Sequence, residues 1–124
     1  MTLILIIGLP NAGKTTYSGR YESVLHLDDF PWRWQPCLKA AATTEASELV
    51  VEGIYNFARR RMELLEALKD KPGKRICIWL DTPVEECVRR EDRGRPDGIV
   101  WMHQRQAQLP TEDEGWDEII VVQK

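Results

Sequence analysis

A single segment near the start of the chain restricts the fold more than any other. The aliphatic residues 3–7 are followed directly by residues 8–15, Gly-Leu-Pro-Asn-Ala-Gly-Lys-Thr. A continuous aliphatic run is typical of a strand buried on both faces of a parallel sheet. The glycines predict a tight loop, and the residues from Lys14 onward have the pattern of a helix. The sequence therefore predicts a buried strand, a glycine-rich loop and a helix in immediate succession.

This loop supplies the groups that hold phosphate. Gly8 and Gly13 let backbone N–H groups approach an anion, Lys14 adds a cation, and the Thr15 hydroxyl suits Mg²⁺. Asn11 stands where related loops often have glycine, and asparagine is the residue that best tolerates positive φ after glycine. We therefore expect ATP and Mg²⁺ as ligands, with the metal on Thr15. The residues expected to contact the nucleotide are Gly8, Pro10, Asn11, Ala12, Gly13, Lys14, Thr15 and Thr16.

The rest of the chain alternates apolar runs with helical patterns. The runs cover residues 24–27, 49–51, 76–80 and 119–122, and the helical patterns cover residues 14–22, 57–69, 84–92 and 99–108. Such alternation predicts an α/β fold, a three-layer sandwich around a five-stranded parallel sheet. Residues 30–47 are weakly patterned, and we expect a short helix around residues 38–43 that lies over the strand ends.

Composition limits the classes of protein that remain. A chain of 124 residues, 43% of them hydrophobic, suits one domain that spans residues 1–124. Its 17 Lys and Arg against 20 Asp and Glu argue against a surface that is basic throughout. The three cysteines form no metal-binding pattern. The first apolar run is too short to span a bilayer, so we expect a cytoplasmic protein with no membrane contact.

Asp28 is the leading candidate for a catalytic carboxylate. It follows an apolar run directly, and Asp29 comes next. Phosphoryl transfer to a hydroxyl benefits from a carboxylate that accepts its proton, and we expect Asp28 to be this base. The alternative is that both aspartates only end a strand or start a turn.

An arginine-rich segment follows the fourth apolar run. Arg89, Arg90, Arg93 and Arg95 lie close to two glycines and a proline. A lid of this kind brings guanidinium groups onto a transferring phosphate, and Arg90 and Arg93 are our candidates for catalysis, with Lys14. A helix end whose cations interact with the helix dipole is the alternative, and it suits Arg89 best.

Other residues are less decisive. Glu52 comes at a strand end, where it could hold a metal-bound water, a substrate hydroxyl or an arginine, or simply end the strand. Residues 32–34, Trp-Arg-Trp, could stack on a base or shield the core. Residues 59–61, Arg-Arg-Arg, predict an exposed helix face. His26 and His103 have no partner that the sequence identifies.

Taken together, these motifs resemble the polynucleotide-kinase-like and zeta-toxin-like P-loop kinases. The similarity rests on the phosphate loop, on residues 24–30 (Val-Leu-His-Leu-Asp-Asp-Phe), on the arginine-rich segment and on the ending at residues 110–122, which begins Pro-Thr-Glu-Asp-Glu-Gly-Trp. The resemblance implies an adenylate-kinase-like sheet of order 2-3-1-4-5, a base at Asp28 and a lid arginine at Arg93.

The sequence also departs from these kinases. In polynucleotide kinases an arginine commonly follows the base by three residues, and here that position is Pro31. The stretch between Asp28 and Glu52 is short for a nucleic-acid channel. Residues 49–55, Leu-Val-Val-Glu-Gly-Ile-Tyr, are instead similar to uridine-kinase-like enzymes. The resemblance therefore leaves the acceptor open.

The sequence thus predicts an ATP-dependent phosphotransferase that moves the γ-phosphate of ATP to a hydroxyl. The acceptor is expected to be a nucleic-acid end or a nucleoside-like small molecule. The alternative is an ATP-binding switch or partner-binding module that hydrolyses its nucleotide slowly.

Overall fold

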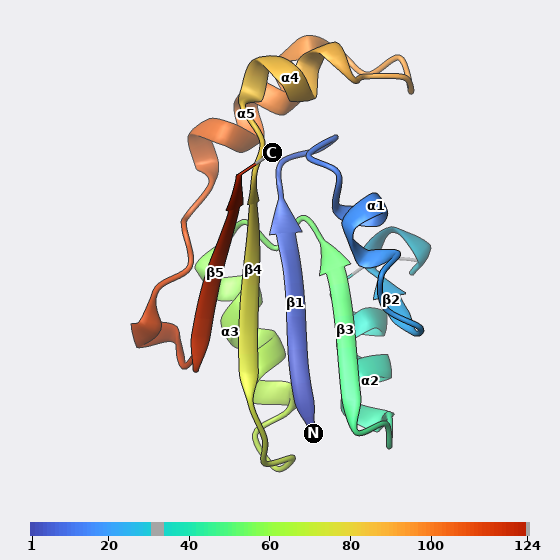
Figure 1. The fold of residues 1–124 in the computed structure, drawn as a ribbon, viewed down its shortest axis with the longest axis vertical. Helices are drawn as coiled ribbons and strands as arrows, with labels where there is room; N and C mark the ends of the chain where they lie inside the picture. Colours follow the sequence, from blue (N-terminus) through green and yellow to red (C-terminus); the bar gives the residue numbers. More distant parts are fainter. Residues whose placement is uncertain (31–33, 124) are drawn as a thin grey trace.

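A computed structural model describes residues 1–30 and 34–123 and has the predicted α/β architecture (Figure 1). Its five-stranded parallel sheet has the order β2-β3-β1-β4-β5, which confirms the order implied by the resemblance. The strands are β1 (Thr2–Gly8), β2 (Val24–His26), β3 (Glu48–Gly53), β4 (Arg75–Asp81) and β5 (Glu118–Gln123). The helices are α1 (Lys14–Ser18), α2 (Trp34–Thr43), α3 (Ala58–Ala67), α4 (Val84–Arg89) and α5 (Asp97–Gln106), with 3-10 turns η1 (Leu27–Asp29) and η2 (Glu112–Glu114).

The central strand β1 is buried because both faces of the sheet are covered. Its side chains alternate, so that Leu3 and Leu5 face a core shared with α2 and α3, while Ile4 and Ile6 face a second core. Side chains of α1, α4 and α5 contribute to this second core. Continuous aliphatic sequence is what such a strand requires. The result is the predicted sandwich of three layers.

The position of α2 differs from the prediction. We expected a short helix over the strand ends, but α2 packs on the face of the sheet beside α3. Cys37 and Ala41 are both fully buried, and their spacing of four residues places them on one face of the helix. This stripe is small and apolar, so the helix can approach the sheet closely.

The prediction that residues 59–61 form an exposed helix face is wrong for Arg61, although Arg59 is exposed. The Arg61 side chain is completely buried. Its Nε and Nη2 atoms each donate to one carboxylate oxygen of Glu114, at 2.8 Å. Its Nη1 donates to the Tyr55 carbonyl, and the Trp116 indole N–H donates to Glu114. The charge is therefore fully partnered inside the protein.

No helix in the described part of the chain combines the length and the apolar character needed to span a membrane. The α4–α5 segment projects beyond the carboxyl ends of the strands (Figure 1). The phosphate loop leaves β1 at this same edge.

Candidate active site

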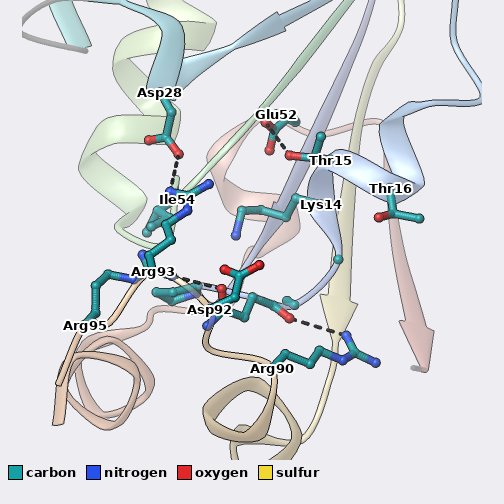
Figure 2. A pocket seen from close by; sticks show the side chains of 14 residues that line it. Lys14, Thr15, Thr16, Asp28, Glu52, Ile54, Arg90, Asp92, Arg93 and Arg95 are labelled. Carbon is teal, nitrogen blue, oxygen red and sulfur yellow. Dashed lines mark hydrogen bonds and ion pairs between the residues drawn. The ribbon is translucent and has the colours of Figure 1, made fainter. Parts of the chain in front are cut away.

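A cavity of about 490 Å³ opens at the carboxyl edge of the sheet (Figure 2). Loop residues 10–16 form one wall, Asp28, Glu52 and Ile54 come from the ends of β2 and β3, and the α4–α5 connection supplies the rest. Parallel strands deliver their terminal residues to one edge, and ligands of α/β proteins bind there. Most of the residues singled out from the sequence therefore meet in one place.

The loop backbone has the conformation expected from its sequence. Asn11 has φ of 67° and Gly13 has φ of 98°. Gly8, which we expect to contact the nucleotide, is not among the residues that line the cavity. A Cβ atom on Gly8 would lie 3.0 Å from the Ala12 Cβ and 3.3 Å from the Leu80 carbonyl oxygen. The absence of a side chain at Gly8 thus allows the loop to fold closely over the strand ends.

Lys14 points into the fold of the loop. Its Nζ donates to the carbonyl oxygens of Leu9 at 2.7 Å and Gly8 at 3.3 Å. Burial lowers the pKa of Lys14 to about 8, although the Glu52 and Asp28 carboxylates act in the opposite direction. The ammonium is thus held by the loop itself and is destabilised by loss of water, which favours exchange of these carbonyl partners for phosphate.

Glu52 connects Thr15 to a histidine that sequence reasoning missed. The carboxylate is only 5% exposed. Its Oε1 accepts from the Thr15 hydroxyl at 3.4 Å and lies 2.7 Å from His26 Nδ1. His26 and Glu52 are register partners on the parallel strands β2 and β3. Both residues lie near the ends of apolar runs, which is the sequence feature that could have indicated a contact. Only the pairing of β2 with β3 identifies these two residues as partners.

These oxygens fit the predicted metal. Among the residues that the structure describes, no group of three or more His, Cys, Asp or Glu side chains could hold a metal ion alone. Mg²⁺ in phosphoryl-transfer sites uses one or two protein oxygens together with water and substrate phosphates. The Thr15 hydroxyl and the buried Glu52 carboxylate are a donor set of that kind. The site therefore suits Mg²⁺ carried by a nucleotide rather than a resident metal.

Asp28 and Arg93, both chosen from the sequence, face each other across the cavity (Figure 2). Arg93 Nη1 lies 4.0 Å from Asp28 Oδ2, and both side chains are about half exposed or more. Asp29 is also exposed, but it does not line the cavity. Asp28 is thus the member of the acidic pair that is placed to meet a ligand.

The other arginines of the segment have distinct positions. Arg90 Nη1 donates to the Asn11 carbonyl at 3.3 Å, and Arg90 Nε donates to Glu86 at 3.0 Å. Arg95, which we did not choose from the sequence, lines the cavity and bonds to both Asn11 and Glu91. Arg89 is exposed on α4 and pairs with Glu86. The arginine-rich segment is therefore attached to the phosphate loop.

The aromatic segment is described in part. Trp32 and Arg33 lie outside the described residues. Trp34 begins α2, its ring meets the Tyr55 ring edge-on with 5.0 Å between centroids, and the Arg60 guanidinium lies over it. Trp34 does not line the cavity. Trp34 therefore shields the core, and its position does not match the alternative of stacking on a bound base.

No protein-family model matches this chain, and no curated protein matches it either. Solved structures do match. A gluconokinase from Sinorhizobium meliloti 1021 superposes with a TM-score of 0.70 at 14% identity, covering 98% of this chain and 82% of that chain. A sugar kinase from Janibacter sp. HTCC2649 gives 0.70 at 15% identity, with coverage of 99% and 85%.

An APS kinase from Mycobacterium tuberculosis, solved in complex with AMPPNP and APS, gives a TM-score of 0.65 at 17% identity, with coverage of 97% and 87%. At such identities the similarity concerns the fold. This chain has the α/β fold of the P-loop kinases, with its parallel sheet in the order 2-3-1-4-5.

Proposed function

We propose that the protein is an ATP-dependent phosphotransferase that moves the γ-phosphate of ATP to a hydroxyl group. The observation that carries this proposal is the composition of one cavity. Lys14 and the phosphate loop lie on one side, Asp28 lies on another, and Arg93 reaches between them. Transfer to a hydroxyl needs a carboxylate placed to accept the hydroxyl proton, and a switch that only binds nucleotide does not need a group in that role. The kinases with the same fold support the proposal.

Each residue has a role that follows from its position. The loop N–H groups bind the phosphates, and Lys14 leaves the Gly8 and Leu9 carbonyls to contact the γ-phosphate. Thr15 and Glu52 would hold Mg²⁺, which when bound would neutralise charge on the phosphates. Asp28 accepts the proton of the acceptor hydroxyl. Arg93 and Arg90 stabilise the charge that develops on the transferring group.

The acceptor is proposed to be a small hydroxyl-bearing molecule. The cavity of about 490 Å³ has to receive both a phosphate tail and the acceptor. Kinases of sugars are among the structures with this fold. A nucleic-acid end is the second candidate acceptor, suggested by the motifs around Asp28 and Arg93. A nucleoside-like molecule falls within the first class.

Transfer of labelled phosphate tests the proposal. The protein is incubated with Mg²⁺, γ-labelled ATP and panels of sugars, sugar acids, nucleosides and oligonucleotides. Label on an acceptor supports a kinase and identifies its class. Label that appears only as free phosphate, with every acceptor, contradicts it in favour of the slow hydrolase.

The Asp28→Asn variant tests the proposed base. We expect transfer to fall on the order of 10²-fold or more, the scale of general-base loss, while ATP affinity stays within a few-fold of the parent. Asp29→Asn is the matched control, because this neighbouring carboxylate does not line the cavity, and it should retain transfer. Equal rates in the two variants would remove Asp28 from the mechanism.

A further inference from the structure

The side chain of Asn11 is embedded in the connection between α4 and α5. Its Oδ1 accepts from Arg95 Nη2 at 2.9 Å, and its Nδ2 donates to Glu91 Oε1 at 2.9 Å and to the Cys87 carbonyl at 3.1 Å. A primary amide offers one oxygen acceptor and two N–H donors. Both ends of this amide are engaged by a segment about 80 positions away in the chain.

Glu91 organises the segment that carries the lid arginines. Its side chain is only 10% exposed. Its Oε2 accepts from the backbone N–H groups of Arg93 at 2.8 Å and Arg95 at 3.2 Å, and its Oε1 accepts from Arg95 Nε at 3.0 Å. The hydrogen bond from Asn11, with the bonds from Arg93 and Arg95, lowers the pKa of Glu91 to about 2. The carboxylate therefore stays ionised and holds the backbone on both sides of Gly94.

The backbone of the loop does not explain the asparagine. Asn11 has positive φ, and glycine adopts that conformation at lower cost. What the amide adds is its contacts, which go to the Cys87 carbonyl in α4 and to Glu91 and Arg95 in the connection that follows. The Arg90 guanidinium adds a bond to the Asn11 carbonyl from the same connection. The loop and the connection are thus joined at both the backbone and the side chain of Asn11.

We propose that Asn11 and Glu91 form a link that positions Arg93 relative to phosphate bound in the loop. The proposal rests on the proposed function, because it assigns Arg93 to the transferring phosphate. Asn11 lies in the cavity wall, and Glu91 accepts a hydrogen bond from the backbone N–H of Arg93. The Arg93 side chain extends to Asp28 (Figure 2). Asn11 and Glu91 are positioning residues, and Arg93 is the residue on which they act.

Asn11→Gly is the most direct test, since glycine preserves the loop conformation and removes the amide. We expect ATP affinity within a few-fold of the parent and transfer slower by roughly tenfold to a hundredfold, the scale of a misplaced catalytic group. The decisive measurement is a double-mutant cycle with Arg93→Ala. If the link acts through Arg93, Asn11→Gly should slow the Arg93→Ala protein little or not at all. The same full loss in both backgrounds would overturn the proposal.

Hydrogen exchange gives a readout that does not depend on transfer. Exchange in a peptide that covers residues 91–96 reports the Arg93 and Arg95 amides held by Glu91. Asn11→Gly and Glu91→Gln should each accelerate this exchange, by about tenfold. Glu85→Gln, which removes an exposed carboxylate elsewhere on α4, should not. Unchanged exchange in both test variants rejects the link. Faster exchange in these variants, combined with no transfer of phosphate from the parent protein to any acceptor, rejects only the proposed phosphotransferase activity.

The two test variants also protect the experiment against a folding failure. If Asn11→Gly does not give a folded protein, Glu91→Gln is carried through the same cycle with Arg93→Ala. Its loop sequence is intact, and the expected pattern is the same. Additive effects in that cycle would overturn the proposal just as they would for Asn11→Gly.

Discussion

At the scale of single residues, Lys14 shows how the site is prepared for an anion. Its ammonium is buried against the carbonyl oxygens of Gly8 and Leu9. Burial lowers the pKa of Lys14 to about 8, whereas a lysine in water keeps its proton to about pH 10.5. A bound phosphate favours the protonated form. In the proposed function, nucleotide binding is therefore linked to protonation of Lys14, and we expect the two to change together with pH.

This linkage predicts a pH dependence with opposite signs for binding and for stability. Above pH 8 the affinity for ATP should fall, approaching about tenfold per pH unit, because the empty site loses the proton that phosphate requires. Stability should rise over the same range, from about pH 8 to about 10.5, because the unfolded chain then binds more protons than the folded one. Titration with a fluorescent ATP analogue and urea unfolding measure the two trends.

The Lys14→Met protein is the reference for both trends. It should bind ATP weakly at every pH. Between pH 8 and 10.5 the free energy of unfolding of the parent should increase relative to that of Lys14→Met. Affinity that is flat through this range in the parent would show that Lys14 keeps its proton in the empty site.

At the scale of elements, one close contact decides where Asp28 lies. The turn η1 passes over the end of β3, so that a Cβ atom added to Gly53 would lie 2.6 Å from the Leu27 Cβ. Asp28 follows Leu27, and Glu52 precedes Gly53. The missing side chain at Gly53 thus allows β2 and β3 to deliver their carboxylates to the same cavity.

Gly53→Ala should therefore affect both stability and transfer. The added methyl group displaces η1, and we expect a loss of about 1–3 kcal/mol in the free energy of unfolding, the usual cost of overpacking. Transfer should fall more than ATP affinity, because the displaced turn carries Asp28 and the phosphate loop is separate. Urea unfolding and steady-state kinetics give the two measurements.

Gly98→Ala is the matched control on another element. A Cβ atom there would meet nothing within 4 Å, and Gly98 lies within α5. Alanine is favoured over glycine in helices, and Gly98 is the second residue of α5, so this variant should be at least as stable as the parent. Similar losses in both variants would show that the contact with Leu27 is not what makes Gly53 necessary.

At the scale of the whole molecule, the sequence predicted what local patterns control. Aliphatic runs identified the strands of the sheet, and the loop motif identified the cavity wall. The pairs that depend on long separations were missed. Glu52 meets His26 through strand register, and Arg61 meets Glu114 across 53 positions. No periodicity encodes such a pairing, and an arginine in a run of three arginines has the pattern of an exposed face.

The pair of Arg61 and Glu114 connects distant parts of the chain. Arg61 belongs to α3, and Glu114 belongs to η2, just before the edge strand β5. Both side chains are almost completely buried, and the pair carries two parallel N–H···O bonds. A buried pair is costly to break, since the remaining charge has no water to solvate it. The ending that resembles the P-loop kinases therefore has a structural role at Glu114.

Glu114→Gln tests this role for the whole fold. The amide cannot accept two N–H bonds from Arg61, and we expect the free energy of unfolding to fall by about 3–5 kcal/mol. Because Glu114 lies outside the cavity, the folded variant should bind ATP as the parent does. Replacing both partners, as Arg61→Met with Glu114→Leu, should recover part of the loss, because no unpaired charge remains and only the Tyr55 carbonyl and the Trp116 N–H lose a partner. A double variant as unstable as Glu114→Gln would instead show that the ion pair itself stabilises the fold, beyond avoiding an isolated charge.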